Sequence, residues 1–162
     1  MTSSARLFAS ALFLAAAAVH AADPKATIAD LDARLAAIGP AKIEGTDVSG
    51  GKTTPAIYFG SRKINNNYDV VDAVRKAHGA TATVFVKDGD EFVRVSTNVL
   101  TPEGKRGVGT QLARNAAYET VSKGQMYCGP IDVLGTAFDA CYNPIKDASG
   151  KTIGLSYIGH KK

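Results

Sequence analysis

The spacing of apolar residues predicts three helices in this chain. In residues 27–38, apolar residues recur every three or four positions, as they do along one face of a helix. They are Ile28, Leu31, Leu35 and Ile38. Thr27 stands where a helix is usually capped, and Gly39, followed by a proline, ends the pattern. Similar spacing predicts a second helix within residues 65–79 and a third within residues 111–124, both ending at a glycine.

Alternation of apolar and polar residues predicts a sheet built mainly from hairpins. The predicted hairpins span residues 81–99, 127–143 and 142–159. Residues 41–60 look irregular, apart from a strand-like stretch at residues 55–60. This order, with antiparallel strands in a row and helices elsewhere, is typical of an α+β domain with one antiparallel sheet.

The turn of the first hairpin decides which of its residues share a face. With Asp88 and Gly89 as the two central residues, Thr83 would oppose Arg94, and the valines of both strands would gather on one face. The other face would carry Thr81, Thr83, Phe85, Phe92, Arg94 and Ser96. This second set suits a small anion, because arginine binds a carboxylate through a planar fork. The alternative is a solvated outer face on which Arg94 merely lies over a phenylalanine ring.

Cys128 and Cys141 are the only two cysteines in the chain. If the second hairpin turns at Leu134 and Gly135, counting outward places the two cysteines opposite each other on one face. That arrangement allows a cross-strand disulfide. A redox motif or a metal site is not favoured, because the chain has no C-x-x-C motif and neither cysteine has a histidine near it.

The first 21 residues have the pattern of a cleaved secretory signal. Arg6 precedes an apolar run at residues 7–19, and the segment closes with small residues. The apolar run is shorter than the roughly 20 residues that a membrane-spanning helix needs. We therefore expect residues 22–162 to be exported to the periplasm as a soluble chain, where the oxidising environment favours a disulfide.

Composition argues against nucleic-acid binding and against catalysis. Without Arg6, the chain has 18 basic and 15 acidic residues, and the basic residues are scattered rather than clustered with aromatic ones. His78 lies late in the second predicted helix and His160 in a tail expected to be disordered, so neither forms an evident catalytic pair with a serine, cysteine or carboxylate. We therefore expect no enzyme activity, no cofactor and no metal.

Several strings of the sequence together resemble one known family. They are ATVF at residues 82–85, FVRVSTNV at 92–99, VGT at 108–110 and PIKDASGKTIGLSYIG at 144–159. In this order and spacing they resemble the extracytoplasmic Cache sensor domains, specifically the single-Cache group that fuses Cache types three and two. The resemblance covers Tyr68 to Gly159 and implies a PAS-like α+β fold. Such a fold has an antiparallel sheet of about five strands, with an N-terminal helix on one face and a ligand pocket under helices and loops on the other.

The resemblance also suggests how the chain is organised and what it does. We expect a leader at residues 1–21, a helix with an irregular lead-in at 22–67 and a Cache core at 68–162. Family members usually lie between membrane-spanning helices, whereas here we expect only the leader and one domain. We therefore expect a stand-alone periplasmic domain, monomeric or a weak homodimer, that binds a small organic acid or amino acid without chemical change. It would report this ligand to a membrane-bound sensor kinase, cyclase or chemoreceptor; the alternative is a scavenging or carrier protein without a signalling partner.

The candidate binding residues follow from the hairpin faces and the resemblance together. Arg94 is the expected anchor for a ligand carboxylate, with Ser96 and Thr83 beside it as hydroxyl donors. The tyrosines expected to close the pocket, unless they are ordinary core rings, are Tyr118, Tyr127 and Tyr142. Asp132 and Asp139 fall on the other face, with the cysteines. If that face forms the pocket, either aspartate would bind an ammonium group and the ligand would be an amino acid.

Overall fold

The computed structural model describes residues 22–162. The signal-peptide prediction for residues 1–21 therefore lies outside the described residues. Within the described part, none of the helices has the length and apolar character needed to cross a membrane.

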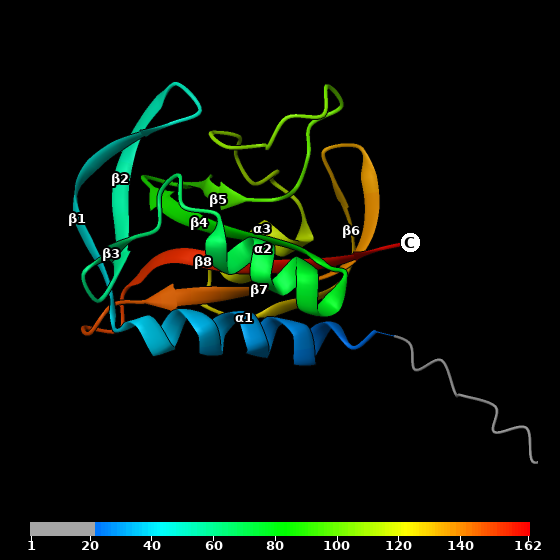
Figure 1. Cartoon of the computed structure of the whole chain (residues 1–162), viewed down its shortest axis with the longest axis horizontal. Helices are drawn as coiled ribbons and strands as arrows, with labels where there is room; N and C mark the ends of the chain where they lie inside the picture. The colour runs from blue at the N-terminus through cyan, green and yellow to red at the C-terminus, as the bar shows by residue number, and fades with distance from the viewer. Residues whose placement is uncertain (1–21) are drawn as a thin grey trace, which may run out of the picture.

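Three helices and two antiparallel sheets make up the described chain (Figure 1). The helices are α1 (Pro24–Ile38), α2 (Asp69–His78) and α3 (Ala116–Val121). The smaller sheet has the order β1-β2-β3, with β1 (Ala41–Ser49), β2 (Lys52–Phe59) and β3 (Arg62–Lys63). The larger sheet has the order β5-β4-β8-β7-β6, with β4 (Thr81–Asp88), β5 (Glu91–Thr97), β6 (Tyr127–Val133), β7 (Thr136–Lys146) and β8 (Thr152–Lys161). The prediction of an α+β domain around a five-stranded antiparallel sheet is confirmed.

A separate apolar core lies on each face of the five-stranded sheet. On one face, α1 and α2 pack against the sheet, as Figure 1 shows. Their buried apolar residues are Ile28, Leu31, Leu35, Val71 and Val74. On the other face, α3 and the preceding loop cover the rings of Phe85, Phe92, Tyr142 and Tyr157. We call these the α1 face and the α3 face.

The lead-in that the sequence predicted to be irregular is a folded three-stranded sheet. β1 and β2 form a hairpin in which Ser49 pairs with Lys52, and both intervening glycines, Gly50 and Gly51, have positive φ angles of 59° and 79°. Most of β1 is exposed because it pairs only with β2 at the edge of the sheet. An exposed edge strand needs no buried face, so the apolar alternation that identifies a strand in a sequence is absent.

The register predicted for the β4–β5 hairpin is wrong. Asp88 pairs with Glu91, so the central turn residues are Gly89 and Asp90 rather than Asp88 and Gly89. Arg94 therefore opposes Phe85 instead of Thr83. The glycine occupies the first turn position with a φ of 60°, which favours glycine there.

A bulge in the same hairpin moves Ser96 away from the α3 face. The register shifts between Val84 and Phe85, so that Val84 pairs with Ser96 and Thr83 pairs with Thr97. A bulge adds one residue to a strand and reverses the face of every residue beyond it. Ser96 thus lies with Val84 on the α1 face, and Thr97 lies on the α3 face, where Ser96 was predicted to lie.

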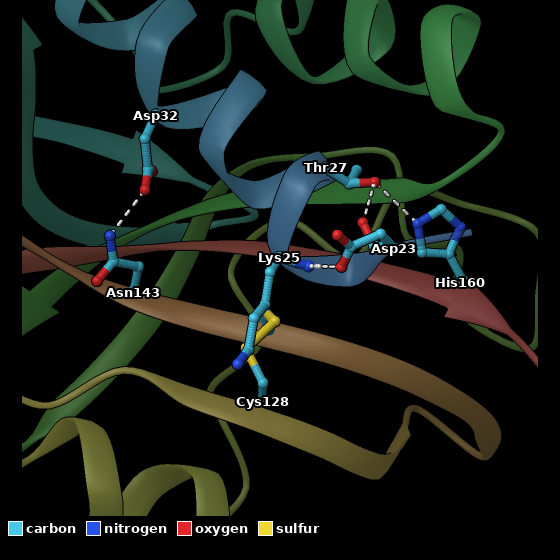
Figure 2. Close-up of a disulfide and its surroundings, with 8 residues drawn as sticks. Asp23, Lys25, Thr27, Asp32, Cys128, Asn143 and His160 are labelled. Atoms are coloured by element: carbon cyan, nitrogen blue, oxygen red, sulfur yellow. Dashed lines mark hydrogen bonds between the residues drawn. A yellow bond between two sulfur atoms is a disulfide. The ribbon is translucent and has the colours of Figure 1, made fainter. Parts of the chain in front are cut away.

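The register predicted for the cysteine hairpin is confirmed. Val133 pairs with Thr136 across the Leu134–Gly135 turn, and Cys128 pairs with Cys141. The two cysteines form a disulfide, with their Cα atoms 4.2 Å apart. Figure 2 shows the disulfide below the start of α1, on the α1 face.

Both ends of the described chain differ from their predictions. α1 is capped by Asp23, whose side chain accepts a hydrogen bond from the backbone N–H of Lys25, and Thr27 lies buried inside the helix. His160, predicted to be disordered, belongs to β8, and its Nε2 lies 3.0 Å from the hydroxyl of Thr27 (Figure 2). The final strand therefore extends under the beginning of α1, and Thr27 and His160 connect the two ends of the described part of the chain.

Candidate ligand-binding site

A row of hydroxyl-bearing residues crosses the whole α3 face. Residues that pair directly on antiparallel strands share a face, and such pairs connect one residue from each of the five strands. The row runs Thr97, Thr83, Tyr157, Tyr142 and Tyr127. This face therefore combines flat apolar rings with polar groups, as a small-ligand site requires.

Small residues in the neighbouring row make room for the tyrosine rings. Gly129, Ala140 and Gly159 pair with one another next to the tyrosines. A Cβ atom added to Gly159 would lie 2.2 Å from the hydroxyl oxygen of Tyr157, and one added to Gly129 would lie 3.0 Å from that of Tyr127. The two rings therefore lie along the sheet, over positions that lack a side chain.

Arg94 lies beside this row and is almost completely buried, with 3% of its surface exposed. Its guanidinium carbon is 4.8 Å from the centre of the Phe85 ring. Nη1 donates to the hydroxyl of Thr110 and to the backbone carbonyl of Gln111, each at 3.0 Å. Nε is also buried and has no hydrogen-bond partner among residues 22–162.

Among the residues that the structure describes, Arg94 has no acidic partner. In the part of the chain that the structure describes, no carboxylate oxygen lies within 4.0 Å of its nitrogens. Burial lowers the pKa of the guanidinium, and the nearby hydroxyls of Tyr142 and Tyr157 act in the opposite direction. A buried charge is costly unless it is paired. Arg94 is therefore a cation in a site whose neighbours are neutral.

The tyrosines beside Arg94 stay neutral at physiological pH. Burial raises the pKa of Tyr142 far above its usual range, and it raises the pKa of Tyr157 to about 12 although a hydrogen bond with Thr81 opposes the shift. A neutral phenol both donates and accepts a hydrogen bond. The hydroxyl of Tyr142 makes no hydrogen bond to any described residue and is thus a further donor at this site.

Residues 107–112, which we call the edge segment, close the site at β5. The backbone N–H of Arg94 donates to the carbonyl of Thr110 at 2.9 Å, and that of Gly109 donates to the carbonyl of Arg94 at 2.8 Å. An isolated β-bridge between Val93 and Gln111 continues this pairing, so Gln111 and Leu112 lie outside the third helix in which they were predicted. The edge segment also supplies both groups that accept hydrogen bonds from the Arg94 guanidinium, the hydroxyl of Thr110 and the backbone carbonyl of Gln111.

The tip of the β1–β2 hairpin touches the edge segment. A Cβ atom added to Gly50 would lie 2.1 Å from the carbonyl oxygen of Val108, and one added to Gly109 would lie 2.7 Å from that of Ser49. Only glycine fits such a close approach of two backbones. The small sheet therefore braces the segment that covers Arg94.

Thr83 lies on the α3 face, as predicted, and Ser96 does not. The hydroxyl oxygens of Thr83 and Thr97 are 2.6 Å apart and buried. The hydroxyl of Ser96 donates to the backbone carbonyl of Asn67 at 2.6 Å, next to α2. Ser96 is thus on the wrong face to contact a ligand held by Arg94.

Two of the three predicted tyrosines already use their hydroxyl groups. Tyr118 donates to the carbonyl of Asp90 at 2.7 Å, and its ring packs edge-on against Phe92. Tyr127 donates to the carbonyl of Pro130 at 3.0 Å and is half-buried at the far end of the row. Both residues line the α3 face, and of the three predicted tyrosines only Tyr142 makes no side-chain hydrogen bond within residues 22–162.

The two predicted aspartates do not meet Arg94. Asp132 and Asp139 are exposed and share the face of the cysteines. Asp132 accepts a hydrogen bond from the backbone N–H of Gly135 in the hairpin turn, and Asp139 lies 3.4 Å from the amine of Lys162. They stabilise a turn and a chain end and lie outside the arginine site.

Sequence reasoning missed Tyr157, the ring closest to Tyr142, at 4.8 Å between centroids. Counted from the β7–β8 turn, where Lys146 pairs with Thr152, Tyr142 would face Ser156. A register shift between Ile145 and Lys146 instead brings it opposite Tyr157. The sequence held no signal for this shift.

Arg94 does not line any of three hollows found on the surface of residues 22–162. The smallest, of about 150 Å³, lies at the end of the α3 face, where Thr81 and Phe138 line it. The other two, of about 440 Å³ and 510 Å³, lie elsewhere. The guanidinium is therefore covered in this structure, chiefly by the edge segment.

Comparison with known proteins identifies the family. Residues 33–162 match the family described as the Cache 3/Cache 2 fusion domain, which agrees with the resemblance seen in the sequence. Cache domains are typically extracytoplasmic ligand-binding sensors and are generally not catalytic. No curated protein and no solved structure was found to match the chain. Because the match spans most of its length, the chain belongs to the Cache 3/Cache 2 fusion domain family.

Proposed function

We propose that this Cache domain binds a small organic acid or amino acid without chemical change, and that Arg94 binds the ligand's carboxylate. The observation that carries the proposal is the burial of Arg94 without an acidic partner among the described residues. A ligand carboxylate would supply the missing negative charge.

The free edge of the guanidinium suits a carboxylate. Nη1 donates to Thr110 and Gln111, whereas Nε is buried and has no partner in the described part of the chain. Nε and Nη2 form one edge of the guanidinium, and a carboxylate can accept from both at once in a bidentate pair. The hydroxyl of Tyr142 is a neutral donor for a second ligand group, and the neighbouring rings provide apolar walls.

Access to Arg94 requires a movement of the edge segment. This segment is tied to β5 by backbone hydrogen bonds and to the guanidinium through Thr110 and Gln111. A carboxylate that enters would change these contacts, and the change would reach the β1–β2 hairpin through the contact between Gly50 and Gly109. We propose that a periplasmic domain of this kind reports ligand binding to a membrane-bound kinase, cyclase or chemoreceptor.

A thermal-shift screen of the purified protein tests the binding proposal. The screen should cover carboxylates, amino acids, amines and purines, and a ligand present at about 100 times its Kd should add about 2.7 kcal/mol of stability. Arg94→Ala should abolish the shift caused by a carboxylate, because losing a buried charged contact typically costs about 2–5 kcal/mol, roughly thirtyfold or more in Kd. Arg94→Lys should restore it only in part, because an ammonium lacks the planar fork.

Arg114→Ala is the matched control. Arg114 also lies over an aromatic ring, 4.5 Å from the centre of Tyr118, but it is exposed and already paired with Glu91. Its loss should leave the carboxylate-induced shift intact. A carboxylate that shifts Arg94→Ala as strongly as the wild type would exclude Arg94 as its anchor.

A further inference from the structure

A groove of about 440 Å³ lies on the α1 face, across the sheet from Arg94. It runs between the C-terminal half of α1 and residues 143–146 of β7. Pairing between β6 and β7 ends at Tyr142, so β7 has an open edge along this groove. Leu35, Phe59 and Ile145 provide apolar walls.

Asp32 lines this groove, and the hydrogen-bond partners of its carboxylate among the described residues are neutral. It accepts from the hydroxyl of Ser156 at 2.5 Å and from the side-chain amide of Asn143 at 2.7 Å, the contact drawn in Figure 2. Within residues 22–162, no lysine, arginine or histidine nitrogen lies within 4.0 Å of it. A carboxylate has about four acceptor positions, so Asp32 can accept further hydrogen bonds.

The charge of Asp32 is poorly compensated where it lies. Burial raises the pKa of this carboxyl, and the hydrogen bonds from Ser156 and Asn143 offset the shift only in part. The cation that lines the groove, Lys146, is exposed and makes no ion pair with Asp32. A cation that enters the groove would therefore interact more strongly with this partly desolvated carboxylate than with a fully solvated one.

We propose that this groove is a second ligand site, independent of Arg94, that binds a small primary amine with an apolar body. The ammonium group donates to the free acceptor positions of Asp32, and the apolar body lies against Leu35, Phe59 and Ile145. One charged group in an otherwise apolar wall is the usual composition of a small-molecule site. A neutral ligand of the same shape would leave the carboxylate uncompensated and would bind less well.

Three probes of matched shape test the charge requirement. Phenethylamine, 2-phenylethanol and phenylacetate should be titrated into the purified protein by calorimetry and followed by amide chemical shifts in NMR spectra. The amine should shift the amides of residues 32–41 and 143–146, and the alcohol should bind about tenfold more weakly. Equal affinities for amine and alcohol, or shifts confined to other residues, would overturn the proposal.

Two substitutions test the role assigned to Asp32. Asp32→Asn keeps the shape and the ability to accept hydrogen bonds, so the protein should stay folded by its NMR spectrum while amine affinity falls about tenfold or more. Lys146→Ala should strengthen amine binding, because it removes a competing cation from the groove. The site is refuted if folded Asp32→Asn binds phenethylamine as tightly as the wild type does, or if Lys146→Ala binds it more weakly.

Discussion

Arg94 and Phe85 face each other across the β4–β5 pair, with 4.8 Å between the guanidinium carbon and the ring centre. The ring of Phe85 packs against the guanidinium, and the edge segment covers the guanidinium through hydrogen bonds from Nη1 to Thr110 and Gln111. Neither neighbour carries a negative charge. The arginine is thus held in place by packing and by hydrogen bonds to neutral acceptors, not by an ion pair with these neighbours.

Replacing Arg94 with an apolar residue of similar length should not destabilise the empty protein. Arg94→Met keeps the contact with Phe85 and removes a buried charge that has no acidic partner among residues 22–162, so the free energy of unfolding should stay the same or rise. Urea denaturation of the ligand-free protein measures it. A loss of about 3 kcal/mol or more, as expected when a buried ion pair is broken, would show that Arg94 is paired.

Arg106→Met is the comparison for that experiment. Arg106 donates to both carboxylate oxygens of Asp72 at 2.8 Å and to the backbone carbonyl of Thr97 at 3.0 Å. Both side chains of this pair are partly exposed, at 35% and 44%. Its loss should lower the free energy of unfolding by about 1 kcal/mol, the upper range for such pairs.

The pH dependence of stability should change in opposite directions for two aspartate variants. Burial raises the pKa of Asp32, so its contribution to stability is greatest below the unfolded-state pKa and is lost as the pH rises through the folded-state pKa. Asp32→Asn should remove this loss. Its free energy of unfolding relative to the wild type should therefore rise between about pH 4 and about pH 7.

Asp72→Asn should show the reverse trend. The hydrogen bond from Arg106 is the main cause that lowers the pKa of Asp72, so its stabilisation is present above the unfolded-state pKa and is lost as the pH falls. Relative to the wild type, this variant should be least stable near neutral pH and should recover in acid. Denaturation curves at several pH values would contradict both assignments if the two variants changed in the same direction.

The disulfide should contribute substantially to stability. Cys128 and Cys141 close a loop with a sequence separation of 13 residues, which is worth about 3 kcal/mol in the chain-entropy treatment. Denaturation of a Cys128→Ser/Cys141→Ala double variant measures the loss. Intact mass spectrometry of protein from an oxidising compartment should show a mass two hydrogens below that of the reduced form, and finding both thiols free would disprove the bond.

Gly159→Ala should destabilise the α3 face. The added methyl group would lie 2.2 Å from the hydroxyl oxygen of buried Tyr157 and 3.0 Å from a ring carbon of Phe138, and overpacking of this kind costs about 1–3 kcal/mol. Adding Tyr157→Phe removes the nearest atom, so the double variant should recover at least about 0.5 kcal/mol relative to the sum of the single changes. Strictly additive losses would mean that the tyrosine ring does not lie over Gly159.

Features set by near neighbours in the chain could be predicted. The apolar spacing identified α1 and α2, although the cap of α1 is Asp23 rather than Thr27. The opposition of Cys128 and Cys141 followed from counting outward from one turn, because no bulge interrupts that pair of strands. The family resemblance also predicted the five-stranded sheet correctly.

The sequence by itself determined which residue types reach the sheet, and only the tertiary structure decided their faces and neighbours. One bulge places Ser96 on the α1 face instead of the α3 face, and another register shift pairs Tyr157 with Tyr142. The sequence singled out Arg94, but only the placement of the strands and loops around it shows that no carboxylate of the described residues pairs with it. The physical reason is that periodicity and turn chemistry act over a few residues, whereas bulges, strand edges and charge pairing depend on segments distant in the chain.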